Sequence, residues 1–112
     1  MRRLLNSYIM RLLENKITLI TGAGRGIGRV IAEQFAKDGA TVYVNDLQEG
    51  DMATWADDCA SRNGVKVVPV CFDVTDSAAL KAGLMSIYKA EGRIDCVVNN
   101  AAIIANQKLG MV

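Results

Sequence analysis

Apolar runs and helical patterns alternate along this chain. Four short runs rich in β-branched residues predict strands at 17–21, 40–46, 65–73 and 94–100. Strands that alternate with helices at this spacing are typical of parallel sheets with right-handed crossovers. We therefore expect an α/β fold, part of a Rossmann-type doubly wound parallel sheet with three helices.

Apolar residues recur at intervals of three and four between the strands, and each group predicts one face of a helix. The groups are Ile27, Val30, Ile31 and Phe35; Met52, Trp55, Ala56, Cys59 and Ala60; and Leu80, Leu84, Ile87 and Tyr88. A glycine follows each group, at Gly39, Gly64 and Gly92. Because glycine adopts the left-handed conformation that ends many helices, these glycines predict the three helix ends.

Pro69 lies within the third predicted strand and indicates the strand order. Since proline cannot donate to a ladder, its strand is expected at an edge of the sheet, which the order 3-2-1-4 provides. The other edge is then the fourth strand, whose "CVV" is apolar on both faces, as in a central strand. An apolar strand with an unpaired edge favours self-association.

Composition narrows the classes of function. The 112 residues form one domain at most, and 51% hydrophobic residues indicate a folded chain. A net charge of +1 gives no reason to expect a nucleic acid or membrane partner. The chain contains no histidine, which excludes Ser-His-Asp and Cys-His catalysis and most zinc sites, so we expect no metal.

The cysteines and the N-terminus bear on the compartment. Cys59, Cys71 and Cys96 are odd in number and lie in apolar patterns, which predicts buried free thiols in a reducing compartment, the cytoplasm. The N-terminal segment has no long apolar stretch and no cleavage site, so neither a signal peptide nor a membrane span is expected. We predict an N-terminal extension at 1–9 and a domain at 10–112.

The stretch "TGAGRGIG" at residues 21–28 joins the first predicted strand to the first predicted helix. N–H groups at a helix N-terminus lack intrahelical partners and carry partial positive charge, and glycines there let a pyrophosphate approach them. The usual G-x-G-x-x-G register fails at Ile27, whereas T-G-x-x-x-G-x-G fits Thr21, Gly22, Gly26 and Gly28. A tight turn with close packing is the alternative explanation.

Polar residues end the other three predicted strands at the same edge of the sheet. Asp46 ends the second strand, where a carboxylate can accept hydrogen bonds from an adenosine ribose; a simple turn aspartate is the alternative. Residues 73–75 (DVT) end the third strand beside the expected adenine, although they also suit a cap for the third helix. Residues 99–101 (NNA) end the fourth strand, where a nicotinamide would lie; tandem asparagines also occur in ordinary turns.

Together these motifs resemble those of the short-chain dehydrogenases/reductases. "TGAGRGIG" is similar to the family's glycine motif, "DVT" to its adenine-side motif, and "VVNNAA" to its N-N-A-G motif except at the last position. The likeness covers residues 10–112 and looks closest to bacterial 3-oxoacyl-acyl-carrier-protein reductases, enzymes of fatty acid biosynthesis. It implies that 10–112 is a partial NAD(P)-binding Rossmann domain that lacks the catalytic C-terminal half.

The resemblance also implies a role for each motif. The glycine turn would hold the pyrophosphate and adjoining ribose, Asp46 with Leu47 the adenosine ribose, residues 73–74 the adenine, and residues 100–101 the nicotinamide ribose. The implied cofactor-binding residues are Thr21, Gly22, Gly24, Arg25, Gly26, Ile27, Gly28, Asp46, Leu47, Asp73, Val74, Asn99, Asn100, Ala101 and Ala102.

Two residues bear on the choice of cofactor. Asp46 would repel a 2′-phosphate and favours NAD, whereas Arg25 is of the kind that pairs with one and favours NADP. We expect NAD to be preferred because the carboxylate would lie directly at the 2′ position. Ala102 replaces the last glycine of its motif, and its methyl group weakens cofactor binding if that position requires a positive φ.

The reaction implied by the resemblance is a reversible NAD(P)-dependent reduction of a small-molecule carbonyl to an alcohol. Family members move the proton with a tyrosine followed four residues later by a lysine. Here Tyr8, Tyr43 and Tyr88 are followed at that distance by Leu12, Leu47 and Gly92. We therefore assign no catalytic residue and expect the chain alone to be inactive.

Two other functions are weighed against this oxidoreductase interpretation. One is a non-catalytic module that only binds a dinucleotide. The other is an S-adenosylmethionine-dependent methyltransferase, whose fold also places a glycine loop after the first strand and an acid after the second. The end of the fourth strand, "NNAA", lacks the acidic or N-P-P-type motif of the methyltransferases, which counts against that function.

Overall fold

The computed structural model describes residues 12–100, so the predictions for residues 1–9, Ala101 and Ala102 lie outside the described residues. The elements follow the predicted alternation of strands and helices. In chain order they are β1 (Ile17–Ile20), α2 (Gly26–Lys37), β2 (Thr41–Asp46), α3 (Met52–Asn63), β3 (Val67–Cys71), α4 (Ser77–Glu91) and β4 (Cys96–Val98).

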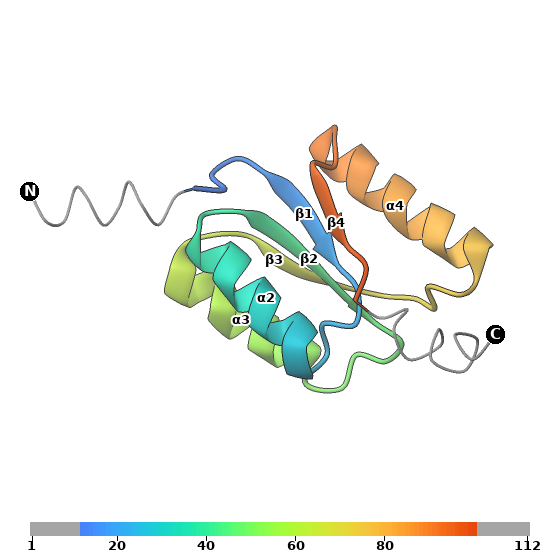
Figure 1. Ribbon diagram of the computed structural model, residues 1–112, viewed down its shortest axis with the longest axis horizontal. Helices are drawn as coiled ribbons and strands as arrows, with labels where there is room; N and C mark the ends of the chain where they lie inside the picture. Colours follow the sequence, from blue (N-terminus) through green and yellow to red (C-terminus); the bar gives the residue numbers. More distant parts are fainter. Residues whose placement is uncertain (1–11, 101–112) are drawn as a thin grey trace, which may run out of the picture.

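The four strands form one parallel sheet in the order β3-β2-β1-β4, as predicted. Figure 1 shows α2 and α3 on one face of this sheet and α4 on the other. Pro69 lies opposite Val44 on the edge strand β3, where a missing N–H on the outer side breaks no ladder bond. The Rossmann-type α/β fold with three helices is confirmed.

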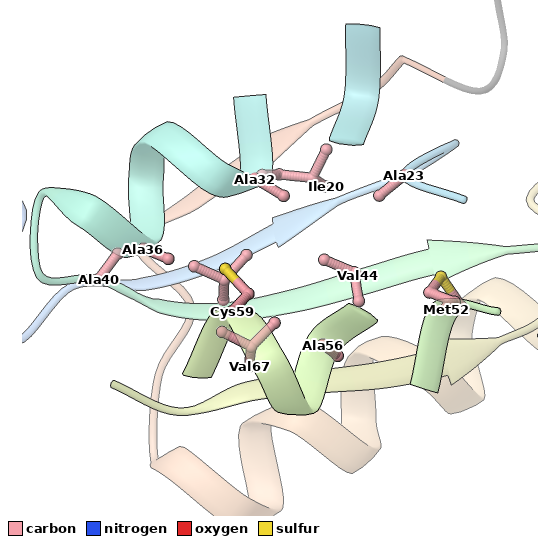
Figure 2. Packing of buried hydrophobic residues seen from close by; sticks show 11 residues of the cluster. Ile20, Ala23, Ala32, Ala36, Ala40, Val44, Met52, Ala56, Cys59 and Val67 are labelled. Atoms are coloured by element: carbon pink, nitrogen blue, oxygen red, sulfur yellow. The ribbon is translucent and has the colours of Figure 1, made fainter. Parts of the chain in front are cut away.

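The core under α2 and α3 is built from small helix residues packed on aliphatic strand residues (Figure 2). On α2 the fully buried positions are Gly28, Ala32 and Ala36. The prediction that Ile27 and Val30 belong to the core-facing stripe is wrong, because they are 72% and 67% exposed. Small residues at every fourth position let the helix axis lie close to the strands, so the large neighbours of those residues are turned outward.

The opposite face of the sheet has a smaller core. Ile17, Leu19 and Tyr43 pack there against Ile87 of α4. Tyr88, predicted to share the buried stripe of α4, is 55% exposed, so this part of the prediction is wrong. The stripe is shifted because Gly83 is buried instead: a Cβ on Gly83 would lie 2.6 Å from Cε2 of the Phe72 ring.

The three cysteines are free thiols, but only Cys59 is buried. The prediction that Cys71 and Cys96 are also buried is wrong. Both lie on edge strands, β3 and β4, where part of each apolar strand has no neighbour in the described part of the chain. Burial raises the pKa of the Cys59 thiol, which keeps it protonated near neutral pH. No helix within residues 12–100 combines the length and apolar character that a membrane span requires.

Candidate functional site

The glycine turn crosses the carboxyl ends of three neighbouring strands. Gly22 and Gly26 have φ angles of 67° and 63°, which favour glycine over residues with a side chain. The N–H of Thr21 donates to the carbonyl of Val98 on β4 at 3.0 Å, and the N–H of Ala23 donates to that of Asn45 on β2 at 2.8 Å. The turn is therefore held on both sides of β1.

Gly24 and Asp46 form a direct contact. The Gly24 N–H donates to Asp46 Oδ2 at 2.8 Å, and the Leu47 N–H donates to Asp46 Oδ1 at 2.8 Å. A Cβ on Gly24 would lie 2.4 Å from Oδ2, so a side chain at position 24 would displace the carboxylate. Each carboxylate oxygen keeps a second acceptor position, which suits hydroxyl donors of a ligand.

Gly28 and Asn100 form a second contact, on the other side of the turn. Asn100 Nδ2 donates to the Gly22 carbonyl at 3.2 Å, and a Cβ on Gly28 would lie 2.3 Å from that same oxygen. Close packing thus explains Gly24 and Gly28, as the alternative interpretation proposed. Gly26 differs, because a Cβ there would meet nothing within 4 Å.

The N-terminus of α2 is well suited to an anion. Its N-cap residue, Arg25, has an extended backbone and makes no side-chain capping bond, and its first turn contains no acidic residue. By contrast, α4 is capped by Asp76, whose Oδ1 accepts from the N–H groups of Ala78 and Ala79 at 3.0 and 3.2 Å. The first-turn N–H groups of α2 lack intrahelical partners and lie at the positive end of the helix dipole.

Asp73 lies two residues beyond Cys71, which pairs with Asp46 in the sheet. Its Oδ1 accepts from the Thr75 hydroxyl at 2.7 Å and from the Thr75 N–H at 2.9 Å, and these bonds lower the pKa of Asp73. The alternative in which Asp73 caps the third helix is wrong, since Asp76 is the cap. Asp73 is therefore an exposed, ionised carboxylate, and the adjacent Val74 is half-buried.

The asparagines after β4 contact the glycine turn. Asn99 Oδ1 accepts from the Thr21 hydroxyl at 3.4 Å, and Asn100 contacts the Gly22 carbonyl as described above. The side chains of Arg25, Ile27 and Leu47 are exposed around the same end of the sheet. The structure thus brings the glycine turn into contact with Asp46 and Asn100, whereas Asp73 and Val74 follow β3, the strand beside β2.

Two further residues near the site were missed in the sequence. Arg29 of α2 pairs with Asp51 at 2.8 Å and lies 5.0 Å from the Trp55 ring, and the bond to Asp51 raises the pKa of Arg29. Asn45 is a buried amide at the end of β2, only 1% exposed. The sequence could have pointed to Asn45, because it is a polar residue in the otherwise apolar strand run "VYVND". Nothing in the pattern around Arg29, which follows the glycine motif, marks it as a site residue.

These features fit the binding of a sugar–diphosphate ligand. The uncapped N-terminus of α2 offers N–H donors to a diphosphate, and Asp46 offers acceptors to sugar hydroxyls. Within the described residues there is no group of His, Cys, Asp or Glu side chains arranged to hold a metal ion.

The sequence and the fold were compared with known proteins. The family model described as "short chain dehydrogenase" matches residues 16–111. The 3-oxoacyl-[acyl-carrier-protein] reductase FabG of Thermotoga maritima is 38% identical over 91 residues, which are 81% of this chain and 37% of that protein.

Solved structures agree in fold. L-Sorbose reductase from Gluconobacter frateurii, complexed with NADPH and L-sorbose, matches with a TM-score of 0.75 and 33% identity over 81% of this chain and 35% of its own. A short chain dehydrogenase/reductase from Burkholderia phymatum, in complex with NAD, matches with a TM-score of 0.70 and 32% identity over 76% of this chain and 30% of its own. The chain spans between 30% and 37% of the length of these relatives. From the family match, the glycine turn and the strand order, the chain belongs to the short-chain dehydrogenase family of oxidoreductases, of which it carries the NAD(P)-binding fold.

Proposed function

We propose that this chain is the NAD(P)-binding portion of a short-chain oxidoreductase that interconverts a carbonyl and an alcohol by hydride transfer. The observation that carries the proposal is the hydrogen bond from the Gly24 N–H to Asp46 beside the uncapped N-terminus of α2. This arrangement presents backbone donors and a carboxylate side by side, as a diphosphate joined to a ribose requires.

Each part of the site has a proposed task. The turn from Gly22 to Ile27 holds the diphosphate and the adjoining ribose, Asp46 with Leu47 the adenosine ribose, and Asp73 with Val74 the adenine. Asn100 and Ala101 are proposed to meet the nicotinamide ribose. The bound nicotinamide supplies or accepts the hydride, while this chain's residues bind and orient the carrier.

The proton transfer is proposed to depend on residues that the sequence does not contain. No tyrosine in the chain is followed four residues later by a lysine, so we assign no catalytic residue and expect no turnover by the chain alone. A 3-oxoacyl reductase activity in cytoplasmic fatty acid biosynthesis is the finer proposal, and the 38% identity to a 3-oxoacyl reductase supports it. The similarity to a sugar reductase is nearly as strong, so a polyol or sugar carbonyl is the competing substrate class.

NAD is the proposed cofactor. Asp46 accepts from Gly24 N–H and is thereby held at the sheet edge, where its charge opposes a 2′-phosphate. Arg25 is exposed and supports NADP as the alternative. A module that binds NAD without a reaction is the second candidate function, favoured by the missing Tyr-x-x-x-Lys pair. A methyltransferase is set aside because of the family match.

The experiment compares two alanine substitutions of matched glycines. Gly26 and Gly64 have φ angles of 63° and 65°, and a Cβ on either would meet nothing within 4 Å. Gly26→Ala and Gly64→Ala should therefore lose similar amounts of stability, about 1 kcal/mol each. Only Gly26→Ala places a methyl group where the diphosphate approaches the backbone.

Calorimetric titration of the 112-residue chain with NAD+ tests the proposal. We expect saturable binding to the unsubstituted chain and to Gly64→Ala, and about tenfold weaker binding to Gly26→Ala, equivalent to about 1.4 kcal/mol. Absence of NAD+ and NADP+ binding by the unsubstituted, folded chain would contradict the proposed function. Equal weakening in both variants would place the diphosphate elsewhere.

A further inference from the structure

Asn45 joins three segments at the end of the sheet. Its side-chain Nδ2 donates to the carbonyls of Val70 and Phe72 at 2.9 and 3.1 Å. Its backbone carbonyl accepts from the Ala23 N–H at 2.8 Å. The orientation of the amide is defined by these contacts, because the reversed amide would turn Oδ1 toward two carbonyl oxygens. One residue therefore links the glycine turn, β2 and the segment that leaves β3.

The other end of the same amide makes no bond. Asn45 Oδ1 is buried and has no hydrogen-bond partner among the described residues. A buried acceptor without a partner is unfavourable, so an amide is not the side chain that stability alone would favour here. What the amide does provide is a fixed position for the carbonyls of Val70 and Phe72 relative to Asp46, the next residue in the chain.

The segment after β3 is held at Phe72. The Phe72 N–H donates to the Asp46 carbonyl at 3.2 Å, and the Phe72 ring packs against Gly83 of α4. Beyond it, Asp73 Oδ1 binds Thr75, and the Asp76 N–H donates to the Asp73 carbonyl at 3.0 Å. Residues 73–76 are thus bonded among themselves, and their position relative to Asp46 is set at Phe72.

We propose that Asn45 is a positioning residue for recognition of the adenine base. By holding Phe72, it sets the distance between Asp46, which meets the adenosine ribose, and Asp73, whose ionised carboxylate accepts from the 6-amino group of the base. Asn45 itself would touch neither the ribose nor the base. This inference rests on the proposed function, because it assumes that a dinucleotide binds with its adenine at residues 73–74.

The test uses two dinucleotides that differ only in the base. NAD+ carries the 6-amino group of adenine, whereas nicotinamide hypoxanthine dinucleotide has an oxygen there, which would face the Asp73 carboxylate. We expect the 112-residue chain to prefer NAD+ by about tenfold in calorimetric titration, as for one hydrogen bond to a charged group.

Two variants remove the hydrogen bonds from Asn45 to the carbonyls of Val70 and Phe72 in different ways. Asn45→Asp keeps the shape but turns carboxylate oxygens toward the two carbonyls, and Asn45→Leu keeps the approximate size without a donor. The matched control is Thr18→Val, because Thr18 is equally buried at 1% exposure and its hydroxyl donates to the Thr41 carbonyl at the far end of β2. Circular dichroism checks that each variant is folded.

The expected result is a base preference that falls to about twofold or less in the Asn45 variants and stays near tenfold in Thr18→Val. Amide hydrogen exchange at Phe72, measured without ligand, should speed up in the same two variants. An unchanged preference in a folded Asn45 variant would overturn the inference, as would loss of the fold in both, which would make Asn45 a stability residue. Equal binding of the two dinucleotides by the unsubstituted chain would also overturn the inference alone, whereas binding of neither would overturn the proposed function.

Discussion

At the scale of single residues, Gly24 and Asp46 act as one unit. The carboxylate occupies the space that a side chain at position 24 would fill, and the Gly24 N–H binds it at 2.8 Å. The acid is therefore held by the backbone of the glycine turn as well as by its own strand. In the proposed role, this bond would keep the charge of Asp46 in place against the second negative charge of a 2′-phosphate.

Asp46→Asn tests the role of this charge in the choice of cofactor. The amide oxygen can still accept from Gly24, which keeps the contact with the turn while the negative charge is lost. The bond from the Leu47 N–H is lost as well, because the amide nitrogen cannot accept. We expect the preference for NAD over NADP to fall by about tenfold, equivalent to about 1.4 kcal/mol. Calorimetric titration with both cofactors measures this change in preference.

Asp57→Asn is the control for that experiment, since Asp57 is an exposed carboxylate on α3 and its removal changes the net charge equally. If both substitutions altered the preference to the same extent, the effect would come from the overall charge and not from the Asp46 site.

At the scale of elements, the two faces of the sheet are held differently. Helices α2 and α3 pack through small residues and sulfur-containing side chains (Figure 2). Helix α4 has a smaller apolar contact and adds a polar one: Tyr43 of β2 donates to Glu91 Oε2 at 2.6 Å, and Lys66 Nζ lies 2.7 Å from the same oxygen. Glu91 thus ties the last turn of α4 to β2 and to the segment before β3.

This contact should make stability depend on pH. The hydrogen bond from Lys66, followed by that from Tyr43, lowers the pKa of Glu91 below its ordinary value of about 4.3. A lowered folded-state pKa contributes stability above the unfolded pKa, and this contribution is lost as the pH falls through the folded value. We expect Glu91→Gln to cost about 1 kcal/mol at pH 7 and much less near pH 3.

Urea unfolding at the two pH values measures the difference. Glu49→Gln serves as the control, because Glu49 is an exposed glutamate in the loop between β2 and α3. A loss of stability in Glu91→Gln that is the same at both pH values would argue against an ionised Glu91 as the stabilising group.

At the scale of the whole molecule, the two edges of the sheet differ. The β3 edge carries Pro69, which discourages pairing with another strand. The β4 edge carries Val97, which is 50% exposed, and no strand pairs with its outer side in the described part of the chain. An apolar edge of this kind is open to a strand from another polypeptide.

We expect the 112-residue chain to associate through β4, and Val97→Lys to shift it toward monomer. A lysine on an edge strand opposes pairing through its charge. Sedimentation velocity over a range of concentrations measures the change. The control is Val30→Lys, the same substitution at a position on α2 that is 67% exposed. A sharp monomer peak for the unsubstituted chain would contradict the prediction.

The sequence by itself determined the fold class and the strand order, and it predicted which residues form the candidate site. Alternating patterns define strands and helices locally, Pro69 marks an edge through its missing N–H, and polar residues at strand ends meet wherever parallel strands are joined by helices. These features depend on neighbours in the chain, which a sequence displays directly.

Only the tertiary structure decided which apolar residues are buried and how the site is held together. Ile27 and Val30 are exposed because small residues, among them Gly28, form the buried face of α2. On α4, Tyr88 is exposed while Gly83 is buried against the Phe72 ring, which a count of hydrophobic positions does not reveal. The contact between Gly24 and Asp46 joins positions far apart in the chain, and a shift of a few tenths of an ångström would change it. Such packing is a property of the assembled sheet and helices, and no local pattern encodes it.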